Sequence, residues 1–220
     1  MATTVNLNKL TDDQLTEHLV AWLRQTLPLE EQRRLFVPAL RELATGRPVE
    51  PEQLAALAGV PVEQTLELLR QAPSEWDSSG TRLVGLGLTS QPTPHRFQVG
   101  GHSLYTWCAV DALIFPLLIG APAHVQSPCA ATGELIHIDL TPDGVQHVEP
   151  SSAVVSVVTP DIDISEVRQA SCVPQNFFRS AEAATQWHTG HPEALLLPVA
   201  DLFTLYGRAA MQVWGDQLSG

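Results

Sequence analysis

The chain has 220 residues, of which 44% are hydrophobic, and its 24 acidic residues against 12 basic ones give a formal net charge of −12. This length suits one or two globular domains, and the negative charge disfavours nucleic acid and anionic membranes as partners. Residues 1–6 lack the features of an export signal, and the longest apolar run, residues 107–120, is too short to span a bilayer. We therefore expect a cytoplasmic protein whose three cysteines stay reduced.

Helical patterns dominate the first 75 residues. Thr11–Gln14 has the form of a capping box, and apolar residues follow it at helical spacing as far as Leu27. A second helix is predicted from about residue 29 to residue 44, with Pro38 kinking or splitting it. Residues 51–58 and 61–70 then predict two short helices, each opened by a proline and joined by Gly59-Val60. This arrangement is a helix-turn-helix.

Strand-like segments follow the helix-turn-helix. Residues 83–88 and 96–99 predict a two-stranded wing, so residues 1–100 are interpreted as a winged-helix-like domain. The second helix of the motif presents Glu63 and Glu67 against the single cation Arg70, whereas a DNA-reading helix carries basic or amide side chains. We therefore expect a packing module that does not bind DNA.

The second half, residues 101–220, has the pattern of a compact α+β domain with an antiparallel sheet. Residues 102–119 predict a single helix that bends near Pro116. Turn-like separators then divide four predicted strands of an antiparallel meander, and two helices close the domain. The predicted strands are residues 123–126, 134–140, 145–148 and 153–158, and the predicted closing helices are residues 181–188 and 200–217.

The cysteines are the residues with the most evident chemistry. Cys108 and Asp111 lie three positions apart, so a helix would place a thiol and a carboxyl group on one face. This pair suggests soft-metal binding and proton transfer. Cys129 is interpreted as structural, whereas Cys172 precedes a proline in a loop where structural and cavity-facing roles are both open. The cysteine and histidine spacing does not fit a zinc site, and no phosphate or dinucleotide motif is present.

Several segments together resemble organomercurial lyase (alkylmercury lyase, MerB). The resemblance runs in order from about residue 33 to beyond residue 210, and the Trp-Cys-Ala-x-Asp and Cys-Ala-Ala-Thr-Gly stretches are its most specific parts. The segments that carry it are Leu40–Val49, Gly85–Thr89, Leu104–Pro116, Cys129–Gly133, Val167–Cys172 and Phe177–Phe178.

The resemblance implies a winged-helix-like N-terminal part packed on a small mixed α/β domain. It also implies protonolysis of a carbon–mercury bond, with Cys108, Asp111 and Cys172 at the catalytic positions and Cys129 in a structural one. Mercury, an extreme soft acid, would be bound by the two thiolates as substrate and as Hg(II) product, without a cofactor. Release would require small cellular thiols or a partner such as mercuric reductase. Val173 stands where some relatives carry a further cysteine.

Two other functions remain open at this level. One is a metal-responsive winged-helix regulator that binds mercury or copper and then DNA, which the acidic helix at residues 61–70 disfavours. The other is a catalytically silent relative that binds metal through its thiols. Hydrocarbon release from an organomercurial separates the enzyme from both alternatives.

Overall fold

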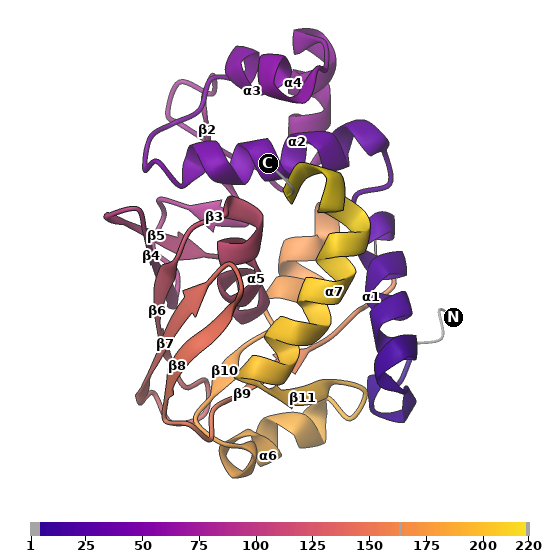
Figure 1. Cartoon of the computed structure of the whole chain (residues 1–220), viewed down its shortest axis with the longest axis vertical. Coiled ribbons are helices and arrows are strands. Elements are labelled where there is room, and N and C mark those ends of the chain that lie inside the picture. The colour runs from indigo at the N-terminus through magenta and orange to yellow at the C-terminus, as the bar shows by residue number, and fades with distance from the viewer. Residues whose placement is uncertain (1–4, 163, 219–220) are drawn as a thin grey trace.

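A computed structural model describes residues 5–162 and 164–218 and has helices packed on two antiparallel sheets (Figure 1). The expected α+β class with antiparallel sheet is confirmed. The helices are α1 (Asp12–Thr26), α2 (Glu30–Leu43), α3 (Pro51–Ala58), α4 (Val62–Gln71), α5 (Ala109–Ile119), α6 (Ala181–Gly190) and α7 (Val199–Leu218). The strands are β1 (Glu75–Trp76), β2 (Leu83–Leu86), β3 (Leu88–Thr89), β4 (His95–Val99), β5 (His102–Thr106), β6 (Ala123–Pro128), β7 (Leu135–Thr141), β8 (Gly144–Glu149), β9 (Val154–Val157), β10 (Phe177–Phe178) and β11 (Leu195–Pro198).

Local signals account for the N-terminal helices. Thr11 and Gln14 form the predicted capping box at the start of α1, each side chain accepting a hydrogen bond from the other's backbone N–H. The helix α2 continues through Pro38 without splitting. Pro51 occupies the first turn of α3, and Gly59 ends that helix in the left-handed conformation (φ 63°) that glycine adopts most readily. The predicted helices of this region are therefore confirmed.

The larger sheet has the strand order β1-β2-β3-β5-β4-β6-β7-β8. The prediction of a wing in which residues 83–88 pair with residues 96–99 is wrong, because β3 and β5 lie between β2 and β4. The sheet also continues across residue 100, since β4 pairs with both β5 and β6. The winged-helix classification and the division of the chain at residue 100 stay predictions.

The prediction of one helix over residues 102–119 is also wrong. Residues 102–106 form β5, which pairs with β4 across a tight turn at Gly100-Gly101, and α5 begins only at Ala109. Cys108 has an extended backbone (φ −146°, ψ 172°) and is the N-cap residue of α5. Sheet pairing therefore overrides the helical appearance of this segment, and it places Cys108 at a strand-to-helix junction.

The second sheet has the order β10-β9-β11. The meander of β6, β7 and β8 is confirmed, but the fourth predicted strand is β9 of this second sheet. All four residues of β9 are buried, as expected for a central strand with both faces covered. The two predicted closing helices are confirmed as α6 and α7.

Helix α5 lies between the larger sheet and α7 (Figure 1). Most of its side chains are buried, which agrees with a sequence that is apolar around nearly the whole helix. Helix α1 packs against the other side of α7. The N-terminus of α5 is therefore held in the interior. Within residues 5–162 and 164–218, no helix combines the length and hydropathy that crossing a bilayer requires.

Candidate active site

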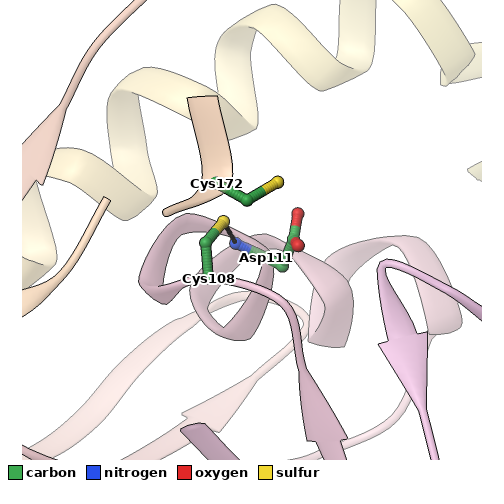
Figure 2. A group of neighbouring side chains, drawn as sticks. All are labelled: Cys108, Asp111 and Cys172. Carbon is green, nitrogen blue, oxygen red and sulfur yellow. Dashed lines mark hydrogen bonds between the residues drawn. The ribbon is translucent and has the colours of Figure 1, made fainter. Parts of the chain in front are cut away.

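The structure brings together the three residues that the sequence singles out. One ligand atom each from Cys108, Asp111 and Cys172 lies within 4.8 Å of the others (Figure 2). Cys108 and Asp111 come from the start of α5, and Cys172 comes from a single π-helical turn, η3 (Arg168–Cys172). The two thiols therefore meet although they are far apart in the sequence.

The cap of α5 positions Cys108. Its Sγ accepts a hydrogen bond from the backbone N–H of Asp111 at 3.4 Å, and its carbonyl oxygen accepts one from Thr106 Oγ1 at 2.9 Å. The next N–H, of Ala109, donates to the carbonyl oxygen of Gln175 at 3.1 Å. These bonds hold the sulfur at the positive end of the helix dipole, where a thiolate is stabilised.

The π turn positions Cys172. The backbone N–H of Val173 donates to the carbonyl oxygen of Arg168 at 3.1 Å, which closes the wide turn. Gln175 then folds back, and its Nε2 donates to the carbonyl oxygen of Ser171 at 3.0 Å and to Ser171 Oγ at 2.6 Å. Hydrogen bonds therefore hold the segment that carries Cys172 in one conformation, and the bond between Gln175 and Ala109 ties it to the start of α5.

A charged cluster ties the same segment to the larger sheet. Arg168 Nη1 lies 2.5 Å from Glu75 Oε1, and the Arg168 guanidinium carbon lies 4.6 Å from the ring centroid of Trp107. Glu75 also accepts hydrogen bonds from Trp107 Nε1 and Thr89 Oγ1. Trp107 directly precedes Cys108, and Arg168 lies four residues before Cys172. The cluster therefore joins the two segments that carry the thiols.

The three side chains line a mainly apolar cavity of about 120 Å³. Its wall combines residues from α1, α2, α5, α7 and the π turn, and six of its members are aromatic. The aromatic members are Trp22, Phe36, Trp107, Phe115, Tyr206 and Trp214. Asp111 Oδ2 is enclosed there and has no hydrogen-bond partner among the residues that the structure describes. The cavity thus holds a polar centre in surroundings of low polarity.

Comparison with known proteins matches this arrangement to one family. The family model described as alkylmercury lyase (MerB) covers residues 88–212, which include all three residues of the site. An alkylmercury lyase of Staphylococcus epidermidis is 51% identical over 172 residues, which span 78% of this chain and 79% of that protein. The chain belongs to the alkylmercury lyase family.

Further relatives agree with this membership. The alkylmercury lyase of Pseudomonas putida is 44% identical over 177 residues, covering 80% of this chain and 82% of the relative. The crystal structure of the mercury-bound form of MerB2 has a TM-score of 0.68 at 24% identity, and the match covers 92% of this chain and 98% of that one. This chain and that structure thus share a fold over nearly their whole lengths.

Burial controls the protonation of this alkylmercury lyase-like centre. It raises the pKa of Asp111 to about 7, against the opposing effect of hydrogen bonds with Cys108. Burial also raises the pKa of the Cys108 thiol well above its usual range, and a hydrogen bond with Cys172 and the charge of Asp111 raise it further. At neutral pH the Cys108 thiol therefore keeps its proton, while Asp111 is poised to gain or lose one.

The third cysteine of this family member lies outside the cavity. Cys129 is buried, and its Sγ accepts a hydrogen bond from the backbone N–H of Arg179 at 3.3 Å. The following N–H, of Ala130, donates to the carbonyl oxygen of Phe177 at 2.9 Å. Cys129 thus joins the end of β6 to the second sheet, and the structural interpretation of this residue stays a prediction.

Sequence reasoning missed four residues that line the cavity or contact the segments that carry the thiols. They are Glu75, Arg168, Gln175 and Tyr206. Glu75 and Tyr206 reach the site from segments distant in sequence, whereas Arg168 and Gln175 are close to Cys172 in sequence but depend on the π turn and on contacts with Glu75 and Ala109. The only signal present in the sequence was that Arg168 lies within a segment resembling the alkylmercury lyase family.

Proposed function

We propose that this chain cleaves the carbon–mercury bond of alkyl- and arylmercury compounds by protonolysis, giving a hydrocarbon and Hg(II). Cys108 and Cys172 bind the mercury, and Asp111 carries the proton. One observation carries the proposal: two thiols and a carboxyl group that titrates near neutral pH meet within 4.8 Å in an apolar cavity. Membership of the alkylmercury lyase family supports the same reaction.

The first step is capture of the organomercurial R–Hg–X. Sulfur is the ligand that soft mercury prefers, so a cysteine thiol replaces X and forms an S–Hg bond. The thiol proton leaves through the Asp111 carboxylate, and X departs as an anion that takes up that proton, so the net product of this exchange is HX. Asp111 can accept the proton because its pKa lies at about 7.

The second step breaks the carbon–mercury bond. The second thiol coordinates mercury and gives its proton to Asp111, and two sulfur donors increase the electron density on the bound carbon. Asp111 then protonates that carbon, the electron pair of the C–Hg bond forms the new C–H bond, and R–H leaves. Mercury stays in the +2 state throughout, so the reaction needs no oxidant, reductant or cofactor.

The apolar cavity suits both steps. The organic group R is apolar and gains from contact with aromatic and aliphatic walls, while bulk water is excluded from the sulfur, mercury and carboxyl atoms. Charges that form during the reaction interact more strongly there than in water. An aryl ring or a short alkyl chain is of a size comparable with the cavity.

We extend the proposal to release of the product and to its setting. Two thiolates leave mercury open to attack by further thiols, so exchange with small cellular thiols or with mercuric reductase removes Hg(II). A cytoplasmic location would supply these thiols. The N-terminal part is proposed to be winged-helix-like and not DNA-binding, because α4 carries Glu63 and Glu67 against the single cation Arg70.

The test is gas-phase detection of benzene released from a phenylmercury salt with excess small thiol. The parent chain should release benzene catalytically, and Cys108→Ser and Cys172→Ser should not, whereas Cys129→Ser should remain active. Stoichiometric mercury binding by the parent without benzene would favour the catalytically silent thiol protein. Salt-dependent DNA binding that responds to mercury would favour the regulator.

A further inference from the structure

Tyr206 lines the same cavity as the two thiols and carries a buried hydroxyl group. It lies on α7, is only 4% exposed, and lines the cavity together with Cys108, Asp111 and Cys172. Its Oη is fully enclosed and has no hydrogen-bond partner among the residues that the structure describes. Buried hydroxyl groups normally have a partner, so this one requires an explanation.

The electrostatics of Tyr206 connect it to the reacting groups. Burial raises the pKa of its phenol, and the charges of Cys108, Asp111 and Cys172 raise it further, with Cys108 exerting the largest of these three effects. The phenol therefore keeps its proton at all relevant pH values and can act as a hydrogen-bond donor. Helix α7, which carries Tyr206, packs along α5, which carries Asp111.

The hydroxyl group is unfavourable in the resting protein. A phenylalanine ring would fill the same space without burying an oxygen that lacks a partner. A polar group that costs stability and belongs to the wall of a functional cavity is often retained for function. In the reaction proposed above, negative charge moves from the Asp111 carboxylate to the Cys108 sulfur when the thiol proton passes to Asp111, and a hydrogen-bond donor beside that sulfur stabilises the charge there.

We propose that the Tyr206 hydroxyl donates a hydrogen bond to Cys108 Sγ when that sulfur is ionised or bound to mercury. Cys108 Sγ then accepts from two donors, Tyr206 O–H and the backbone N–H of Asp111, which are supplied by different helices. The phenol keeps its proton and no bond of Tyr206 forms or breaks. This inference rests on the proposed function and assigns to α7 a direct part in capturing the organomercurial.

The deciding variant is Tyr206→Phe, which removes only the oxygen. We expect kcat/KM for phenylmercury at neutral pH to fall by roughly tenfold, the effect of losing one hydrogen bond to a charged acceptor. We also expect Tm of the mercury-free variant to be unchanged or higher. The matched control is Tyr105→Phe, since Tyr105 is the only other tyrosine of the chain and does not line the cavity.

The two readouts separate the proposal from a purely structural role. If Tyr206 only stabilised the fold, Tyr206→Phe would lower Tm and leave kcat/KM of the folded fraction unchanged. That result would overturn the proposal. An unchanged kcat/KM with an unchanged Tm would overturn it as well. If the parent released no benzene, the proposed function itself would fail. The role of Tyr206 is measured only by the difference between Tyr206→Phe and an active parent.

A second measurement does not depend on the Phe variant folding. In a Tyr105→Phe background every tyrosine analogue supplied during expression enters position 206 alone. Fluorination of the ring makes the phenol a stronger hydrogen-bond donor, so kcat/KM should rise with fluorine substitution. The ¹⁹F resonance should also shift on addition of one equivalent of mercuric ion, but not in a Cys108→Ser variant. A rate insensitive to fluorination and a resonance insensitive to Cys108 would overturn the proposal.

Discussion

Cys108 is the N-cap residue of α5, the helix on which Asp111 lies, and its sulfur accepts a hydrogen bond from the backbone N–H of Asp111 at 3.4 Å. The bond fixes the spacing between thiol and carboxyl group without using the carboxyl oxygens. Asp111 lines the cavity, and its Oδ2 is buried and has no hydrogen-bond partner among the described residues. The cap thus leaves available for the substrate the carboxyl oxygen that we propose as the proton carrier.

Stability should depend on pH through Asp111. Its pKa rises to about 7 on folding from an ordinary value of 3.8, so the folded chain binds more protons than the unfolded chain between these values. The free energy of unfolding should therefore fall as pH rises from about 4 to about 7, by at most roughly 1.4 kcal/mol for each pH unit in that window.

The comparison that checks this effect is urea unfolding of the parent and of Asp111→Asn. The two should be of similar stability at pH 4, and the variant should be the more stable at pH 8. Equal stability differences at both pH values would mean that the carboxyl group is not buried in the way described.

Arg168 should matter more for the position of Cys172 than for the stability of the fold. Its side chain is 46% exposed, so its ion pair with Glu75 should contribute only about 0–1 kcal/mol. Arg168→Gln should nevertheless lower kcat/KM severalfold and speed hydrogen exchange in residues 168–175. Arg82→Gln is the matched control, because Arg82 forms a comparably exposed pair with Asp77. Equal effects of the two substitutions would refute the proposed positioning role.

Gly87 should tolerate no side chain. It has φ +78°, and an added Cβ would lie 2.7 Å from Phe115 Cζ and 3.6 Å from Asp111 Oδ2. We expect Gly87→Ala to cost about 2 kcal/mol of unfolding free energy or more, and also to lower activity. Gly80→Ala shares the positive φ but meets nothing within 4 Å, so it reports the backbone strain alone. Chemical denaturation of both variants measures the difference.

Cys129 should prove structural. Cys129→Ala leaves the backbone N–H of Arg179 without its acceptor and should lower the free energy of unfolding by about 1–2 kcal/mol. Cys129→Ser restores an acceptor and should recover part of that loss. Both variants should cleave phenylmercury as the parent does once folded. A large loss of kcat with unchanged stability would instead place Cys129 in the reaction.

The sequence predicted best what local chemistry determines. The capping box at Thr11 and the prolines that open the short helices determine where helices start, so α1, α3 and α4 could be located. The helix boundary at Cys108 could not be located, because α5 is apolar around nearly its whole circumference and shows no hydrophobic period that marks its start. The pairing of β5 with β4 decides that boundary, and pairing is a property of the whole fold.

The residues of the candidate site also divide into those that local sequence could predict and those that only the whole fold brings together. The spacing of Cys108 and Asp111 is local and predicted their proximity, whereas the approach of Cys172 depended on the family resemblance. The contacts of Glu75 with Arg168, and of Tyr206 with the cavity, link segments distant in sequence. Such contacts follow from packing and leave no periodic signal in a single chain.

The most direct test of the central claim is product analysis in D₂O. Phenylmercury, excess thiol and the parent chain should yield benzene with one deuterium, since in the proposed reaction the carbon takes up a deuteron from the exchanged carboxyl group of Asp111. Folded Asp111→Asn should bind mercury but form benzene at a rate lower by about 10²-fold or more. Benzene formed by Asp111→Asn as fast as by the parent would contradict the account.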